Sequence, residues 1–372
     1  EIYTLSLHDA LPIYRRAMGR KAVGTFMKLT FNLVICLVSL ITMAGYFVPY
    51  ADPAVYPSMP FLGLAIPALL ILCALFIIWL IFKRQFIWLL FPILAIAANY
   101  RYLNGMFQYS PPASAAGKTM KIMTLNAGAV HQEVRLILDD ILLHAREEEV
   151  DIICFQEFNG IRGMPGLDSL FGAYPYRSEP DRGDGKLLLA VFSKYPITDW
   201  QIIPFENSCN DGLWCDLSID GRPVRIVNVH MQTTSITQSR AFIEGIKENY
   251  VIGDLHGVNQ LQNTIQSNFV KRAEQARQVH AIVQSTRSPL ILCGDFNDTP
   301  VSYTYQTIRG DLLKDGFKSC GNGYGYTFHG FFDLLRIDFI LYSQGIHPVS
   351  YYSLPQEWSD HNPVFMGFTL AE

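Results

Sequence analysis

The stretch Pro289-Leu-Ile-Leu-Cys-Gly-Asp-Phe-Asn-Asp298 joins a short apolar run to a cluster of turn-forming and acidic residues. A short apolar run bounded by turn residues is typical of a buried strand. Gly, Asp and Asn favour a turn directly after the run, and Thr299-Pro300 then favours a helix start, with Thr as the cap. The stretch therefore predicts a buried strand over residues 289–293 whose end presents polar side chains.

The same arrangement recurs on both sides of this stretch. Lys121-Ile-Met-Thr-Leu125 ends at Asn126, and Asp151-Ile-Ile-Cys-Phe155 ends at Gln156-Glu157. Further strands are predicted over residues 187–193, 213–219, 224–229, 337–342 and 364–370, and apolar helix faces over 134–142 and 269–283. Many short strands with few helices predict an α+β fold, a four-layer α/β/β/α sandwich of two packed sheets.

Polar groups follow or interrupt these apolar runs at six places. They are Asn126, Gln156-Glu157, Asn228-Val-His230, Gly294-Asp-Phe-Asn-Asp298, Asp338 and Ser359-Asp-His361. Taken singly, each has an ordinary structural explanation, such as a solvated strand end, a turn or a structural histidine. Together they supply what hydrolysis of a phosphate ester requires: oxygen ligands for a divalent cation, a group that activates water, and polar groups for the phosphoryl and leaving oxygens.

As an ordered set these residues resemble the endonuclease/exonuclease/phosphatase superfamily. The motifs are Leu125-Asn126, Phe155-Gln156-Glu157, Asn228-Val229-His230, Gly294-Asp295-Phe296-Asn297, Arg336-Ile337-Asp338 and Ser359-Asp360-His361. That superfamily includes pancreatic-type deoxyribonucleases, neutral sphingomyelinases, inositol polyphosphate phosphatases and AP endonucleases. AP endonucleases typically carry a tyrosine near the position of His230, so the resemblance favours the other branches.

The resemblance implies a metal site. Glu157 is expected to be the main ligand of Mg²⁺ or Mn²⁺, with Asn126 and Asp360 close to that ion or at a second one. Whether one or two ions bind stays open.

The resemblance also implies the groups that act on the phosphate. Asp338 is expected to orient His361, so that this pair serves as general base or phosphate stabiliser, and Asp295 to act on the attacking water or the leaving oxygen. His230 and Asn297 are expected to bind the non-bridging phosphoryl oxygens. Which of Asp295 and His361 deprotonates the water stays open.

Two features near these motifs bear on the substrate. Residues 231–268 are long and polar, and we predict a substrate-facing loop there. Lys271, Arg272 and Arg277 on the following helix are candidates for phosphate contact, the alternative being a solvated helix face.

The charge distribution bears on the choice of substrate. From Pro112 onward the chain carries 21 of the 29 Lys and Arg and 30 of the 33 Asp and Glu, a formal charge of −9. An acidic domain is a poor partner for nucleic acid, whose affinity comes largely from Lys and Arg on phosphates. A small or lipid-borne phosphate ester is therefore the preferred substrate, and a nuclease the alternative.

A non-catalytic binding module on the same fold is the other alternative. Such a module is expected to lack one or more of Glu157, Asp295, Asp338 and His361, and this sequence has all four. No sequence feature points to a protein partner.

The N-terminal third is apolar, which raises the mean hydropathy of the chain to +0.17. Residues 29–51 and 53–82 contain no charged side chain, so each is long enough to span a bilayer as a helix. A third apolar stretch, residues 85–100, contains Pro92 and is marginally long enough, with Tyr100 and Tyr102 as interfacial anchors. We expect three spans, and two remain the alternative.

Flanking charge predicts the orientation. Arg20, Lys21 and Lys28 precede the first span, and Lys83-Arg84 follows the second. Basic residues favour the cytoplasmic side, so three spans place the C-terminal domain outside the cytoplasm and two keep it inside. We predict a multi-pass protein of a bacterial inner membrane with an extracytoplasmic catalytic domain.

These observations predict four regions. They are an N-terminal segment over residues 1–26, a membrane region over 27–104, a linker rich in proline and small residues over 105–119, and a catalytic domain over 120–372. Residues 1–14 fit no secretory pattern, and we interpret the sequence upstream of Met18 or Met27 as foreign or mistranslated.

The seven cysteines show no metal-ligand spacing. Cys209 and Cys215 flank the turn signal Asn210-Asp211-Gly212, which allows a disulfide in an oxidising compartment.

Overall fold

The computed structural model describes residues 7–110, 117–128, 134–158, 165–180, 188–234, 255–357 and 359–371. The chain forms two compact units. The helical unit takes the residues up to Tyr46 together with Ala65–Tyr100, and the sheet unit takes Phe47–Leu64 together with the chain from Arg101 onward. The four predicted domain boundaries stay predictions.

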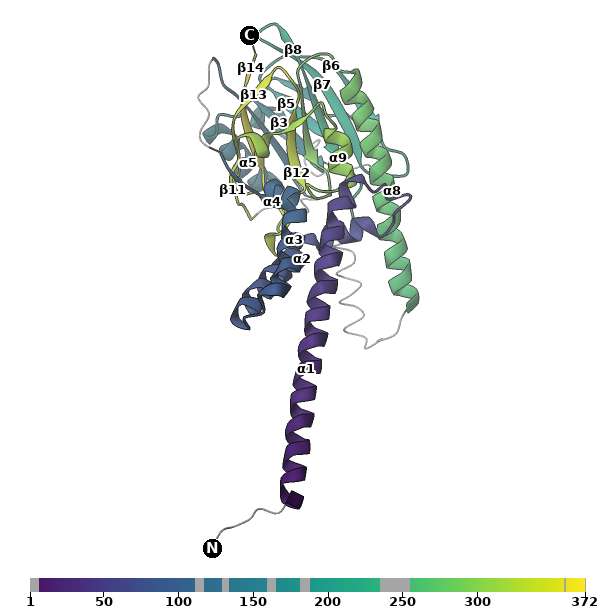
Figure 1. Cartoon of the computed structure of the whole chain (residues 1–372). Helices are drawn as coiled ribbons and strands as arrows, with labels where there is room; N and C mark the ends of the chain where they lie inside the picture. The colour runs from purple at the N-terminus through teal and green to yellow at the C-terminus, as the bar shows by residue number, and fades with distance from the viewer. Residues whose placement is uncertain are drawn as a thin grey trace. The chain divides into compact units, whose positions relative to one another are not determined.

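Apolar helices dominate the N-terminal part (Figure 1). They are α1 (Leu7–Ala44), the 3-10 helix η1 (Gly45–Tyr50), α2 (Met59–Phe82), η2 (Phe86–Leu89), α3 (Leu90–Ala98) and α4 (Tyr100–Met106). Two segments, Ala22–Tyr50 and Met59–Phe82, are long and apolar enough to cross a membrane. The chain from Phe86–Ala98 to Tyr100–Met106 is bent by 54°, so by length and composition it is either a broken third span or a re-entrant loop.

Asn99 lies at the bend and fastens α3 to α1 inside the helical unit. Its Nδ2 donates hydrogen bonds to the backbone oxygens of Thr42, at 2.7 Å, and Ala95, at 2.9 Å. In apolar surroundings a polar side chain needs such partners, so Asn99 links the two helices through hydrogen bonds.

The sheet unit contains two six-stranded sheets. One has the order β10-β12-β9-β8-β7-β6, formed by β6 (Ile197–Pro204), β7 (Asp211–Ile219), β8 (Arg222–His230), β9 (Leu290–Asp295), β10 (Lys314–Asp315) and β12 (Asp338–Tyr342). The other has the order β13-β14-β2-β3-β5-β4, formed by β2 (Met120–Asn126), β3 (Ile152–Gln156), β4 (Tyr176–Ser178), β5 (Ala190–Ser193), β13 (Ile346–Ser353) and β14 (Val364–Leu370). A separate pair joins β1 (Phe107–Tyr109) to β11 (Asn322–Tyr324).

Helices cover the outer faces of both sheets. The described helices of this unit, besides α4, are α5 (Val134–Glu147), α6 (Leu167–Leu170), α8 (Leu255–Ser285), α9 (Tyr303–Arg309) and α10 (Gly316–Cys320). Side chains alternate along a strand, so Ile122 of β2 packs between the sheets while Met123 packs in the cluster that includes Leu138 of α5. On the opposite side, Val279 of α8 packs in a cluster with Leu292 of β9. The predicted α/β/β/α sandwich is confirmed.

Two parallel strand pairs decide where the polar strand ends meet. In the pair β2 and β3, Asn126 lies opposite Gln156, and in the pair β8 and β9, His230 lies opposite Asp295. The sheets are joined near these ends by a hydrogen bond of 2.6 Å from Gln156 Nε2 to Asn228 Oδ1. Antiparallel β12 adds Asp338, directly opposite Asp295.

The predicted secondary structure was incomplete or wrong in several details, and the short strands β4, β10 and β11 were among those not predicted. Strands β6 and β13 were not predicted, because their partly exposed faces lack a continuous apolar run. Helix α8 begins at Leu255, so residues 255–268 are helical rather than part of a loop, and residues 235–254 lie outside the described chain. Helix α9 begins at Tyr303 with Ser302 as its cap, whose Oγ accepts from the Tyr305 backbone N–H at 3.0 Å, and not at Thr299-Pro300.

The structure answers the question that the sequence left open for Cys209 and Cys215. Cys209 is exposed and Cys215 is buried between the sheets, and both are free, so no disulfide joins them. Within the predicted linker, Phe107–Tyr109 forms β1. Residues 111–116 lie outside the described chain.

Candidate active site

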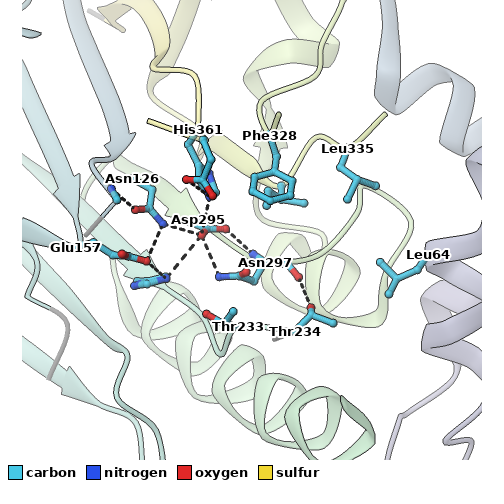
Figure 2. A pocket seen from close by; sticks show the side chains of 14 residues that line it. Leu64, Asn126, Glu157, Thr233, Thr234, Asp295, Asn297, Phe328, Leu335 and His361 are labelled. Atoms are coloured by element: carbon cyan, nitrogen blue, oxygen red, sulfur yellow. Dashed lines mark hydrogen bonds and ion pairs between the residues drawn. The ribbon is translucent and has the colours of Figure 1, made fainter. Parts of the chain in front are cut away.

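A pocket of about 210 Å³ lies at the carboxyl ends of the two parallel strand pairs (Figure 2). Its lining comprises Leu64, Asn126, Gly128, Glu157, His230, Thr233, Thr234, Asp295, Asn297, Phe328, Leu335, Ile337, Asp360 and His361. The sandwich therefore brings together side chains that are far apart in the sequence.

The backbone conformation at Gly294, Glu157 and Asn297 orients several of the side chains that line the pocket. Gly294 has φ +130°, and a Cβ there would lie 2.0 Å from the Val229 carbonyl oxygen, so only glycine allows β9 to approach β8 before Asp295. Glu157 and Asn297 have φ of +56° and +52°, in the left-handed region that non-glycine residues seldom adopt. Such backbone strain is concentrated at functional sites.

Asn126 connects two carboxylates across the pocket. Its Nδ2 donates to Asp295 Oδ2 at 3.1 Å and lies 3.3 Å from Glu157 Oε1, while its Oδ1 accepts from the Gly128 backbone N–H at 3.0 Å. The Ser359 hydroxyl donates to the Asn126 carbonyl at 2.9 Å. Asn126 is therefore held from both ends, and its orientation follows from these partners.

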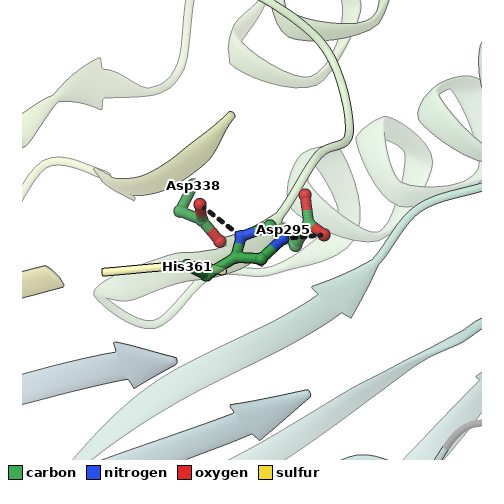
Figure 3. A group of neighbouring side chains, drawn as sticks. All are labelled: Asp295, Asp338 and His361. Atoms are coloured by element: carbon green, nitrogen blue, oxygen red, sulfur yellow. Dashed lines mark hydrogen bonds and ion pairs between the residues drawn. The ribbon is translucent and has the colours of Figure 1, made fainter. Parts of the chain in front are cut away.

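His361 is paired with Asp338 (Figure 3). Its Nδ1 lies 2.9 Å from Asp338 Oδ2, and its Nε2 lies 3.9 Å from Asp295 Oδ2. Burial alone would lower the pKa of His361, but the Asp338 and Asp295 carboxylates outweigh it and raise the pKa to about 10. The pair therefore holds a proton on the imidazole while Nε2 faces the pocket.

Asp295 is the most heavily hydrogen-bonded carboxylate of the site. It accepts from the Asn297 backbone N–H at 2.7 Å and from Asn297 Nδ2 at 2.9 Å, in addition to Asn126. Burial raises the pKa of Asp295 to about 6, against the opposing effect of His361. Asn297 Nδ2 also donates to the Met231 carbonyl at 3.1 Å, so both of its amide hydrogens are used within the protein.

His230 lies between two carboxylates without bonding to either. Its Nε2 is 3.7 Å from Glu157 Oε1 and 3.6 Å from Asp295 Oδ2, and neither ring nitrogen has a hydrogen-bond partner in the described chain. Burial lowers the pKa of His230 to about 4, so the ring is neutral at pH 7. A buried imidazole with both nitrogens unpartnered is suited to contact a ligand.

Negative charge at the site exceeds its positive partners. Four carboxylates, those of Glu157, Asp295, Asp338 and Asp360, lie at or beside the pocket, and no Lys or Arg is among its described lining residues. Burial raises the pKa of Glu157, because the positive charges and hydrogen-bond donors near the carboxylate do not fully offset the loss of solvent. A divalent cation with oxygen ligands fits this donor set.

Two groups of side chains offer ligand atoms for such an ion. Single ligand atoms of Asp295, Asp338 and His361 lie within 4.8 Å of one another, but Asp338 and His361 already bond to each other. Glu157 instead presents a carboxylate of 20% exposed surface to the pocket, and Asp360 one of 59%. Glu157 and Asp360 therefore leave more oxygen atoms open to an ion, whereas Asn126 Oδ1 already accepts from Gly128.

The structure thus brings all eight residues predicted for the site to one place. The three basic candidates for phosphate contact are not among the described residues that line this pocket. Arg272 is buried against Asp298 at 3.2 Å, Lys271 donates to the Asn207 carbonyl at 2.8 Å, and Arg277 pairs with Asp52 at 3.0 Å.

Sequence reasoning missed the apolar wall of the pocket. Leu64, Phe328 and Leu335 lie on the side away from Glu157 (Figure 2), and Ile337 also lines the pocket. Ile337 stands next to Asp338 in the quoted motif, so its position could have been noticed, but nothing in the sequence marks Leu64 as part of this pocket.

Comparison with known proteins agrees with this geometry. Residues 123–361 match the model of the Endonuclease/Exonuclease/phosphatase family, and residues 25–106 match a domain of unknown function, DUF8431. This chain belongs to the Endonuclease/Exonuclease/phosphatase family. The family acts on phosphoesters and includes phosphatases and nucleases.

Several solved structures are similar to the chain. They include a humanised TDP2 from D. rerio (15% identity, 68% of this chain and 99% of that chain, TM-score 0.49), the human Nocturnin catalytic domain (16%, 68% and 94%, 0.48) and a mannosyl-6-phosphatase from Bacteroides thetaiotaomicron (18%, 68% and 100%, 0.47). No curated protein matches the chain by sequence.

Proposed function

We propose that this protein is a membrane-anchored, divalent-metal-dependent hydrolase that cleaves a phosphate ester by attack of an activated water. The observation that carries the proposal is the Asp338–His361 pair, whose free imidazole nitrogen faces Asp295 beside Glu157 and Asn126. Family membership supports the same chemistry.

Glu157 and Asp360 would hold Mg²⁺ or Mn²⁺, because they present carboxylate oxygens to the pocket. For Asn126 to join them, its Oδ1 would have to leave the Gly128 N–H. Bound there, the ion would neutralise phosphoryl charge and polarise the ester as a Lewis acid. Charge balance supports this role, since the described pocket lining contributes no Lys or Arg.

The protein's own residues divide the remaining tasks. Asp338 fixes the imidazole of His361, so that Nε2 exchanges a proton or hydrogen-bonds to phosphate at the pocket. Asp295, 3.9 Å from that nitrogen, orients the water or the leaving oxygen. His230, neutral and unpartnered, and Asn297 are the residues assigned to the phosphoryl oxygens. For Asn297 this requires an amide hydrogen to leave Met231.

The two walls of the pocket bear on the substrate. One wall is carboxylate-rich, and the opposite one carries Leu64, Phe328 and Leu335. A substrate whose phosphate is attached to an apolar group would match both walls, because burying apolar surface stabilises the complex by about 25 cal/mol per Å². The substrate class is therefore a small or lipid-borne phosphate ester.

Contacts within the sheet unit support an extracytoplasmic catalytic domain. Asp52, in the segment between the first two apolar helices, pairs with Arg277 at 3.0 Å, and Phe61 contacts Phe269 with ring centroids 5.3 Å apart. The segment after the first span and the catalytic fold must then share one side of the membrane. That arrangement requires a third crossing between Lys83-Arg84 and the catalytic fold, and basic flanks favour a cytoplasmic N-terminus.

Reporter fusions after residue 117 test the orientation. An export-dependent reporter should be active there and a cytoplasm-dependent one silent. The opposite result would contradict the three-span arrangement.

A substrate panel tests the activity. The full-length chain in neutral detergent should hydrolyse a phospholipid monoester or a sphingomyelin-type diester with Mg²⁺ or Mn²⁺, and lose activity in EDTA. Plasmid and single-stranded DNA should be poor substrates, and efficient cleavage of DNA would favour the nuclease alternative. Full activity in EDTA, or no hydrolysis of any ester, would contradict the proposal.

A further inference from the structure

A second cavity of the sheet unit, about 380 Å³, shares no lining residue with the active-site pocket. Four cationic side chains line it: Arg101 of α4, Arg309 at the end of α9, Lys314 of β10 and Lys318 of α10. The catalytic part of the chain is acidic overall, with a formal charge of −9 from Pro112 onward. The basic lining of this cavity therefore contrasts with the net negative charge of the domain.

The one carboxylate that lines this cavity, that of Asp315, is already used. It accepts from Arg336 Nη1 at 3.0 Å and Nη2 at 2.6 Å, and from the Tyr305 hydroxyl at 2.8 Å. The Asp315 carboxylate therefore bonds directly to the buried Arg336, and among the cations of the cavity it acts on Lys318 through space.

Among the basic side chains of this cavity, Lys318 shows most clearly that few carboxylates are in direct contact with them. Within the described chain its ammonium has no ion pair, and its recorded contact is the face of the Tyr305 ring, with Nζ 5.0 Å from the centroid. Burial lowers the pKa of Lys318 to about 8, Asp315 opposes that shift, and Arg336, Arg309 and Arg101 add to it. Among the described residues, the partly buried Lys318 ammonium therefore has Asp315 nearby but no carboxylate in direct contact.

The position of the cavity in the chain suggests where an anion would come from. Pro49 and Tyr50 also line it, and Tyr50 is the last residue of the candidate span Ala22–Tyr50. Arg101 follows Tyr100 at the start of α4, in the segment that would complete a third span. Residues at span ends lie at the depth of lipid head groups, where Arg, Lys and Tyr are favoured.

We propose that this cavity binds the phosphate-bearing head group of an anionic lipid. Arg309 and Lys318 supply charge-assisted hydrogen bonds from the catalytic fold, and Arg101 supplies them from the segment next to the membrane. The assignment does not depend on the hydrolase activity. A soluble phosphate anion offers the same chemistry, and the test separates the two sources.

The test measures the thermal unfolding midpoint of the full-length chain in neutral detergent with EDTA, which keeps metal out of the active-site pocket. Phosphatidylglycerol, phosphatidylcholine and inorganic phosphate are titrated separately. Phosphatidylglycerol should raise the midpoint saturably, and phosphatidylcholine should not. The Arg309→Gln/Lys318→Gln variant should bind phosphatidylglycerol at least about tenfold more weakly, since each lost charge-assisted bond is worth about 1.5–3 kcal/mol.

Controls distinguish loss of the site from loss of the fold. Arg146→Gln removes one positive charge from an exposed position on α5, at the other sheet, and should bind like the wild type. Arg309→Lys should recover part of the affinity, and the double variant should unfold at no lower temperature than the wild type without lipid. If phosphatidylglycerol raised the unfolding midpoint of the wild type and of the double variant equally, the proposal that this cavity binds the lipid would be wrong. Stabilisation by inorganic phosphate without any by phosphatidylglycerol would overturn its assignment to lipid.

Discussion

Arg336 and Asp338 are two residues apart in the sequence, but each belongs to a different cluster of buried charged side chains. The two clusters differ in how their charges are balanced. Arg336 forms two hydrogen bonds to Asp315, at 2.6 and 3.0 Å, and a third of 2.9 Å to the Gly105 carbonyl. The cluster around Asp338 contains one such pair, with His361, but adds the Asp295 and Glu157 carboxylates without a Lys or Arg among the described residues that line the pocket.

The difference separates structural charge from functional charge. A buried charge with an opposite charge beside it holds elements together, here α4, β10 and the segment before β12, and needs no ligand from outside the chain. A group of buried carboxylates with too few cations is costly unless a ligand completes it. The first cluster should govern stability and the second activity.

The largest expected effect is on turnover at the second cluster. Asp295→Asn and His361→Gln should each lower kcat by about 10²–10⁴-fold, the range for loss of general acid–base catalysis. Asp295→Asn keeps one acceptor oxygen but turns the other into a donor that faces the Asn126 and Asn297 amides, so turnover is compared per folded molecule, with the unfolding midpoint measured beside it. Steady-state kinetics on the best phosphate ester check this, and near-normal turnover would remove that residue from the mechanism.

The next effect is on stability at the first cluster. Arg336→Met leaves Asp315 buried without its cation and should cost about 3–5 kcal/mol of the free energy of unfolding. The Arg336→Met/Asp315→Leu variant should lose less, because no charge remains unpaired. Denaturant titration measures both losses. Turnover per folded molecule should stay close to that of the wild type, and loss of turnover without loss of stability would place Arg336 in the active site.

Metal binding should stabilise the fold by a smaller amount. Mg²⁺ or Mn²⁺ at a hundredfold excess over its Kd should add about 2.7 kcal/mol by mass action. Glu157→Gln should abolish most of this gain, while Glu147→Gln, an exposed position on α5, should keep it. Unfolding midpoints with and without the ion provide the measurement. An equal gain in both variants would exclude Glu157 as the main ligand.

The smallest expected effect is a pH dependence at the cationic cavity. The pKa of Lys318 falls from 10.5 to about 8 in the folded chain, so between these values the unfolded state binds more protons and stability rises with pH. Lys318→Met should therefore be more stable than the wild type below pH 8, in phosphate-free and lipid-free detergent. The difference should shrink as the pH approaches 10, and a constant difference would show that the charge is not its cause.

Much of the fold and the location of the site follow from local sequence patterns. Apolar runs that end in polar residues, such as the one that ends at Asp295, predicted the strands and the end of each strand that carries chemistry, because burial on both faces requires a continuous apolar run. Strands β6 and β13 lack such a run and were missed. Lys271, Arg272 and Arg277 illustrate a second limit, because spacing on a helix says nothing about which partner lies opposite each residue.

By itself the sequence determined the class of fold, the family and the set of polar strand ends, since these depend on residue type and periodicity along the chain. Only the tertiary structure decided which charges are compensated. Arg336 and Asp338 are neighbours in one motif, yet one completes a structural pair and the other belongs to a carboxylate-rich pocket. Leu64 and Arg101 likewise acquired their places at the two cavities from packing across long sequence separations, which no local pattern encodes.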